Sequence, residues 1–300
     1  MRLAGAVDIG ATNTKIGIVS EDGRVFRRAT IPTRTGSAPD DLIDTIAREL
    51  RPMIDALTDE RNQIVAIGIS VAGFIDREHT MMITNANLQW LCDFQLRRAF
   101  EERFELNCHL EVDSNASTVA EYRHGVGRGA LRLLGLTIGT GVGGGVIVGG
   151  RLLRYTGECA GDVAHIVIDT EGRRCTCGAI GCLEAMVCAA AVSERAQSRH
   201  PREVISAAKK GEASAIDALD ETGRMLGRGL ASLSPIFSPD KIVIGGGIAV
   251  AGDYLLQPAR ESYNQHVADE FRDKVAIEGS AFEGWDGIVG AASLALAPLD

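Results

Sequence analysis

The chain has 300 residues, of which 45% are hydrophobic, enough for one large or two medium domains with a sizeable core. Its formal net charge of −9 argues against a protein that binds duplex nucleic acid, because such a protein needs a basic face. We find no apolar run suited to a signal peptide or a membrane-spanning helix. Seven cysteines in such a chain are typical of reduced thiols, so we expect a cytoplasmic protein.

The first part of the chain predicts a hairpin followed by alternating helices and strands. Two Val/Ile-rich segments flank a Gly/Thr/Asn turn, which predicts a β-hairpin over 6–19. Apolar residues recur at helical spacing over 40–57, where we expect Pro52 to kink the helix or end it early. A compact apolar strand is predicted over 65–71 and an amphipathic helix over 94–105.

The second part of the chain repeats this layout. Residues 133–149 predict another hairpin with a Gly/Thr turn, and this weak internal repeat indicates two lobes that face one phosphate-bearing ligand. A strand at 241–244 runs into three glycines, and an Ala-rich helix is expected near 288–297. Strands alternating with helices predict an α/β fold.

The glycine-rich turns are candidate phosphate-binding sites. Glycine allows close backbone approach, so successive N–H groups can surround phosphate oxygens, while Thr12 can donate a hydrogen bond and Asp8 can hold Mg²⁺ through water. Neither hairpin turn has the Gly-Lys-Ser/Thr ending of a Walker-A loop, and two ordinary hairpin turns are the alternative. The residues concerned are Asp8, Gly10, Thr12 and Lys15 in the first turn, Gly139, Thr140 and Gly141 in the second, and Gly245, Gly246 and Gly247.

A cysteine cluster predicts a metal site. His165, Cys175, Cys177 and Cys182 offer one imidazole and three thiolates, which is a ligand set for tetrahedral zinc. Gly178 and Gly181 allow the backbone to fold tightly between these ligands. With four protein ligands no coordination position stays open, so the role would be structural. Buried reduced thiols beside an unrelated histidine are the alternative.

These motifs together resemble the ROK family of sugar kinases and regulators. The resemblance rests on residues 8–15, 139–144, 160–165, 175–184 and 287–292. It implies the two-domain actin-like ATPase fold, related to ribonuclease H, with a deep cleft between a small lobe (1–112 with about 288–300) and a large lobe (113–287) that carries a zinc loop at 165–182. It further implies ATP with Mg²⁺, structural Zn²⁺, a hexose or N-acetylhexosamine substrate, and a homodimer.

The resemblance also implies roles for individual residues. Asp113 in the sequence Asp-Ser-Asn-Ala matches the catalytic aspartate, which takes or orients the proton of the attacking hydroxyl; a plain helix N-cap is the alternative. His165 would bind zinc through one ring nitrogen and face a sugar hydroxyl with the other. The sugar contacts implied are Gly73, Asn87, Asp113, Asp162, His165 and Glu184.

Three positions depart from the family pattern. Asp162 stands where these kinases usually have glutamate, Val112 where asparagine commonly precedes the catalytic aspartate, and Ala164 where glycine precedes the histidine. The carboxylate of Asp162 is one methylene shorter, so it would reach a sugar hydroxyl less well. We therefore expect that glucose is not the best substrate.

Three functions agree with these residues. We favour a hexose 6-kinase; a kinase for an N-acetylated or epimeric hexose and a sugar-sensing regulator are the alternatives. Regulators of this family usually carry an N-terminal helix-turn-helix, and here the first hairpin begins at residue 6. The sequence leaves open which sugar is bound and whether polyphosphate replaces ATP as donor.

Overall fold

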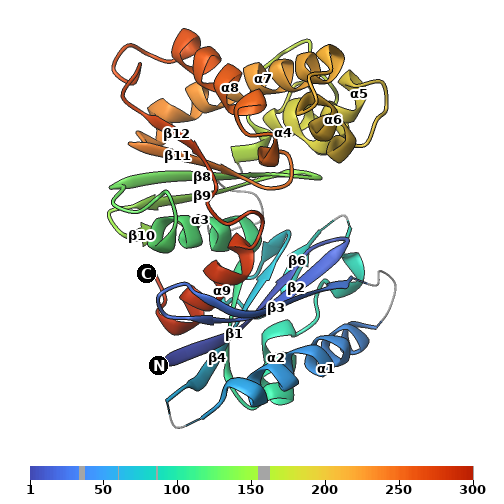
Figure 1. The fold of residues 1–300 in the computed structure, drawn as a ribbon, viewed down its shortest axis with the longest axis vertical. Helices are drawn as coiled ribbons and strands as arrows, with labels where there is room; N and C mark the ends of the chain where they lie inside the picture. The colour runs from blue at the N-terminus through green and yellow to red at the C-terminus, as the bar shows by residue number, and fades with distance from the viewer. Residues whose placement is uncertain (34–37, 60, 86, 155–162, 300) are drawn as a thin grey trace. The chain divides into compact units, whose positions relative to one another are not determined.

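The computed structural model describes residues 1–33, 38–59, 61–85, 87–154 and 163–299. The chain divides into two compact units, drawn in Figure 1. The first comprises Met1–His124, Gly150–Ala160 and Trp285–Asp300, and the second comprises Gly125–Gly149 and Gly161–Gly284. This division differs from the predicted lobes, because the helix that begins at Asp113 packs against the last helix and so belongs to the first unit.

The first unit contains one five-stranded sheet and four α-helices among its described residues. Its elements are β1 (Arg2–Ile9), β2 (Asn13–Ser20), β3 (Val25–Pro32), α1 (Pro39–Leu57), β4 (Gln63–Val71), β5 (Phe74–Ile75), β6 (Met82–Thr84), η1 (Gln89–Leu91), α2 (Leu96–Phe104), β7 (Asn107–Val112), α3 (Asp113–His124), β10 (Arg151–Leu152) and α9 (Asp286–Leu296). The predicted hairpin, strand and helices are all present, with bounds shifted by a few residues.

The sheet of the first unit brings three strand ends to one edge. Its strand order is β3-β2-β1-β4-β7, in which β1 and β4 and likewise β4 and β7 are parallel. Helices α1 and α2 lie on one face of this sheet and α9 on the other (Figure 1). Helix and sheet meet closely, since a Cβ on Gly68 would lie only 2.1 Å from Ala291 O. The residues at the carboxyl ends of β1, β4 and β7 therefore lie beside the start of α9.

Helix α1 does not end at Pro52, contrary to one of the two expected outcomes. Pro52 is exposed, and the helix continues through it to Leu57. Proline removes one backbone hydrogen bond, and on the solvent side the freed carbonyl can bind water. Leu50 is fully buried and Met53 packs against the same core, so apolar burial holds the helix on both sides of the proline.

The second unit combines a sheet with a helical layer. Its elements are β8 (Arg132–Ile138), β9 (Val142–Val148), η2 (Val163–His165), α4 (Leu183–Val187), α5 (Ala189–Arg195), α6 (Pro201–Ala208), α7 (Ala213–Phe237), β11 (Lys241–Gly245), η3 (Ala249–Ala251), α8 (Asp253–His266) and β12 (Ala276–Gly279). Within this unit the strand order is β9-β8-β11-β12. The second predicted hairpin is β8 and β9, paired antiparallel.

Helices α7 and α8 lie against each other beside this sheet (Figure 1). Their contact depends on glycines, because a Cβ on Gly223 would lie 2.4 Å from Leu255 O and one on Gly227 would lie 2.4 Å from Ala259 O. Among the described residues, no helix combines the length and the apolar character that a membrane-spanning segment requires.

Candidate functional site

A carboxylate lies at the edge where β1 and β4 end. Asp8 accepts a hydrogen bond from Ser70 Oγ at 2.9 Å and pairs with Lys15 Nζ at 3.4 Å. A Cβ on Gly287, in the first turn of α9, would lie 2.6 Å from the Asp8 carboxyl carbon, so glycine is required there. Burial raises the pKa of Asp8, and the positive charge of Lys15 opposes this effect.

Asp113 begins α3 and is electrostatically coupled to Asp8. Its Oδ1 accepts a hydrogen bond from Ser114 N at 2.7 Å, which fixes the carboxyl at the start of the helix. Burial, followed by the negative charge of Asp8, raises the pKa of Asp113 to about 7; Asp286 adds to the rise, while Ser114 N and Lys15 oppose it. A carboxyl with such a pKa can accept a proton near neutral pH, as a general base must.

The corner between β7 and α3 is held by a buried carboxylate two residues before Asp113. Glu111 is 1% exposed; its Oε1 accepts from Asn115 Nδ2 at 3.0 Å and its Oε2 from Arg154 Nε at 3.0 Å. Arg154 also donates to Leu299 O at 2.6 Å. Because both Glu111 oxygens have partners, the charge is compensated and the backbone that leads into Asp113 is fixed.

Sequence reasoning missed two members of this site, Ser70 and Asp286. Strand β1 pairs in parallel with β4, and the register places Ser70 directly beside Asp8. The signal for Ser70 was its position at the end of a predicted strand, since polar residues at the carboxyl ends of parallel strands gather at one edge. Asp286 opens α9 and is buried, a first-turn position that favours an acidic residue.

Asn85 contacts both Gly73 and Asn87, which are two of the predicted sugar contacts. Gly73 has a φ of +109°, and a Cβ there would lie 2.5 Å from Thr84 O and 2.9 Å from Asn85 Cβ. Asn85 Oδ1 in turn accepts hydrogen bonds from Asn87 N at 2.7 Å and Leu88 N at 3.0 Å. Asn87 itself is exposed. Asp162, another predicted sugar contact, lies outside the described residues.

In the second unit, the predicted 139–144 turn comprises the loop 139–141 and the first residues of β9, and it lies beside the predicted 245–247 turn, which begins at the last residue of β11. Gly246 has a φ of +86°, and a Cβ there would lie 2.4 Å from Ile138 O at the end of β8. Ile248 N donates to the same carbonyl at 3.0 Å. Two of the three predicted phosphate-binding turns are therefore neighbours, as a shared ligand would require.

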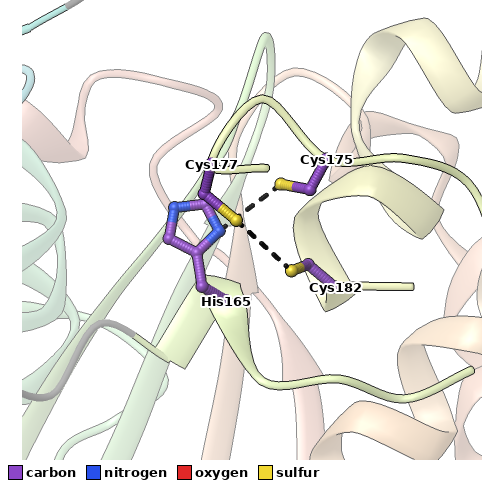
Figure 2. Close-up of side chains that lie close together, drawn as sticks. All are labelled: His165, Cys175, Cys177 and Cys182. Carbon is purple, nitrogen blue, oxygen red and sulfur yellow. Dashed lines mark hydrogen bonds between the residues drawn. The ribbon is translucent and has the colours of Figure 1, made fainter. Parts of the chain in front are cut away.

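The four predicted zinc ligands converge in the second unit. Figure 2 shows His165 and the three cysteines pointing toward a common centre, and their ligand atoms all lie within 4.8 Å of one another. Cys175 Sγ lies 3.5 Å from His165 Nδ1, and Cys177 Sγ lies 3.6 Å from Cys182 Sγ. Sulfurs bound to one tetrahedral zinc at about 2.3 Å lie about 3.8 Å apart, so the donor set fits zinc.

We call residues 165–182 the cysteine module. Its backbone conformation depends on Gly178 and Gly181, the two glycines singled out in the sequence. Gly178 has a φ of +98° and Gly181 a φ of +74°, values that favour glycine. A Cβ on Gly181 would lie 1.5 Å from Asp169 O, so no larger residue fits. Gly178 N donates to Cys175 O at 3.0 Å and Cys175 N to Ala179 O at 2.8 Å, which closes the loop that presents the sulfurs.

Several known proteins resemble this chain over nearly its whole length. The ROK family model matches residues 4–297. A glucokinase of Streptomyces coelicolor is 31% identical over 99% of both chains, and an N-acetylmannosamine kinase of Escherichia coli O7:K1 is 28% identical over 97% of both. The crystal structure of a ROK family glucokinase from Streptomyces griseus, in complex with glucose and AMPPNP, superposes with a TM-score of 0.86 at 29% identity, covering 98% of this chain and 99% of the other.

The chain therefore belongs to the ROK family and has the two-domain actin-like ATPase fold that its sequence predicted.

The hydrogen bond from Ser70 to Asp8 gives a direct test of this site. Replacing Ser70 with alanine removes a donor from a largely buried carboxylate, so we expect sugar-kinase kcat/KM to fall roughly tenfold, about 1–2 kcal/mol. Ser20 is the matched control, because it is a buried serine on β2 that donates to Asp22 instead. Coupled ADP-release assays on both alanine variants, with thermal melts to confirm folding, make the comparison. Equal activities would exclude Ser70 from the site.

Proposed function

We propose that this chain is an ATP-dependent kinase of a hexose or an N-acetylhexosamine, which it phosphorylates at the 6-hydroxyl with Asp113 as general base. One observation carries the chemical part of the proposal: the electrostatically coupled, partly buried pair of Asp8 and Asp113 at one sheet edge. Relatives that match nearly the whole chain are sugar kinases, so ATP-dependent sugar phosphorylation is the favoured activity and the regulator alternative is not favoured.

The two carboxylates have separate tasks in this reaction. Asp113 accepts the proton of the sugar hydroxyl while that oxygen bonds to the γ-phosphorus of ATP and the bond from phosphorus to the ADP oxygen breaks. Asp8, kept near Lys15 and Ser70, would hold Mg²⁺ through water. When bound, Mg²⁺ would neutralise part of the negative charge that develops on the phosphate oxygens during transfer.

In this proposal the glycine-rich turns bind the phosphates of the nucleotide. Gly10, Thr12 and Lys15 would bind phosphate oxygens from the first unit. From the second unit, Gly139, Thr140 and Gly141 would act with the 245–247 turn, which lies beside them. Successive N–H groups in such turns make anion-binding concavities, and neighbouring turns can share one nucleotide.

Sugar recognition falls to residues that the family resemblance implies. Gly73 and Asn87 come from the first unit, whereas His165 and Glu184 come from the cysteine module and the start of α4. Zinc held by the module would fix His165 through one ring nitrogen and turn the other toward a sugar hydroxyl. The shorter side chain of Asp162 supports the expectation that glucose is not the preferred sugar. We further propose a homodimer, which sedimentation equilibrium tests.

The activity is tested with a panel of sugars. Glucose, mannose, allose, N-acetylglucosamine and N-acetylmannosamine are each incubated with MgATP, ADP release is measured, and the product is identified by phosphorus NMR. We expect stoichiometric ADP and sugar 6-phosphate for at least one of them, with a higher kcat/KM for another sugar than for glucose. If no sugar is phosphorylated by the folded protein, the kinase proposal is wrong; if glucose is preferred, only the inference from Asp162 fails.

The metal is tested by composition. We expect about one zinc per chain in protein purified without chelators. Replacing Cys177 with serine removes one thiolate ligand and should release the metal and lower the melting temperature of the second unit. Cys92, half-buried in the first unit, provides the control: its serine variant should retain zinc. Active wild-type protein free of zinc would contradict the assignment.

A further inference from the structure

A single carboxylate joins the cysteine module to the 139–144 turn. Glu184 lies in the first turn of α4, two residues after Cys182, and its Oε2 accepts a hydrogen bond from Val142 N at 3.0 Å. The fit is tight, because a Cβ on Gly141 would lie 2.6 Å from the same oxygen. The backbone amide of the turn is therefore aimed at this side chain and fixed by it.

The other oxygen of Glu184 faces the module. Thr176, which stands between two of the cysteine ligands, donates from Oγ1 to Glu184 Oε1 at 3.3 Å. Cys175 Sγ lies 3.8 Å from the same oxygen. The carboxylate thus bridges the loop that presents the sulfurs and the turn that presents backbone N–H groups.

Two further contacts attach the turn to segments next to the proposed zinc ligands. Val163 lies two residues before His165, and its Cγ2 would lie 2.2 Å from a Cβ on Gly144, so the Val163 side chain packs directly on the Gly144 backbone. At the other end of the turn, Ala189 N donates to Gly139 O at 2.8 Å. Segments on both sides of the module therefore contact this region at Gly139, at Val142 and at Gly144 in β9.

We propose that the cysteine module sets the conformation of the 139–144 turn through Thr176 and Glu184, so that metal binding and nucleotide binding are energetically coupled. This inference rests on the proposed function, in which the turn binds nucleotide phosphate. Thr176 is a positioning residue in this proposal because it acts on the nucleotide only through the turn, and Glu184 does the same in addition to the sugar contact proposed above.

The coupling would arise because metal binding reduces the conformational freedom of the segments that contact the turn. A metal that ties His165 to three sulfurs restricts the segments that contact the turn, so less conformational entropy is lost when phosphate orders it. Coupling between two binding sites is reciprocal: if zinc strengthens MgADP binding by a given factor, MgADP strengthens zinc binding by the same factor. Typical couplings of this kind are roughly 5- to 150-fold.

The test measures binding and needs no turnover. Calorimetry gives the Kd of MgADP for the zinc-loaded full-length protein and for its Thr176→Val and Thr170→Val variants. Thr176→Val keeps all four metal ligands and removes one hydroxyl, so we expect Kd to rise roughly two- to tenfold with zinc content unchanged. Thr170 is the matched control, because it is another exposed threonine of the same loop, and its valine variant should bind as wild type does.

A second arm measures the coupling itself. Zinc affinity is determined by competition with a chelator, with and without saturating MgADP, and the nucleotide should tighten zinc binding at least fivefold. Equal zinc affinities, together with an unchanged Kd in Thr176→Val, would overturn the proposal. Wild-type protein that binds no MgADP and phosphorylates no sugar would overturn the proposed function instead, so the two failures are distinguishable. Wild-type protein that binds MgADP but no zinc would overturn the coupling alone.

Discussion

The main electrostatic constraint on the first unit is that two partly buried carboxyl groups, Asp8 and Asp113, lie close enough to interact. Burial raises the pKa of both carboxyls, the negative charge of Asp8 raises the pKa of Asp113 further, and the positive charge of Lys15 opposes these effects only in part. Such an arrangement is costly for a folded protein, and it is retained at active sites because it tunes a base. The parallel strands, the glycine at the start of α9 and the Glu111 corner all serve to hold these two groups in place.

In the second unit, the main constraint is that the backbone amides of the 139–144 turn must be held in a fixed geometry. Its 139–144 turn has few side chains with which to hold itself, so neighbouring segments must fix it. Glu184 and Ala189 bond to it and Val163 packs against it, and all three belong to the segments around the cysteine module. The candidate metal site and the proposed phosphate-binding turn are therefore joined by direct contacts.

Much of this was readable from the sequence because it is encoded locally. The hairpins follow from apolar segments around glycine-rich turns, and the four candidate zinc ligands lie within one short segment whose glycines Gly178 and Gly181 have positive φ. Ser70 and Asp286 were missed because their roles arise only when β4 and α9 pack beside β1. Helix α1 continues through Pro52 because burial of its apolar face outweighs one lost hydrogen bond, a balance that local propensity does not reveal.

The role of Asp113 as the base for phosphoryl transfer can be measured by single-turnover kinetics of the Asp113→Asn variant. With enzyme in excess and both substrates bound, rapid quenching follows the formation of sugar phosphate. Asparagine is nearly the same size and cannot accept the proton, so the transfer rate should fall ~10²–10⁴-fold while the affinities for MgADP and sugar stay close to wild type. A variant that transfers phosphate at nearly the wild-type rate would contradict the claim.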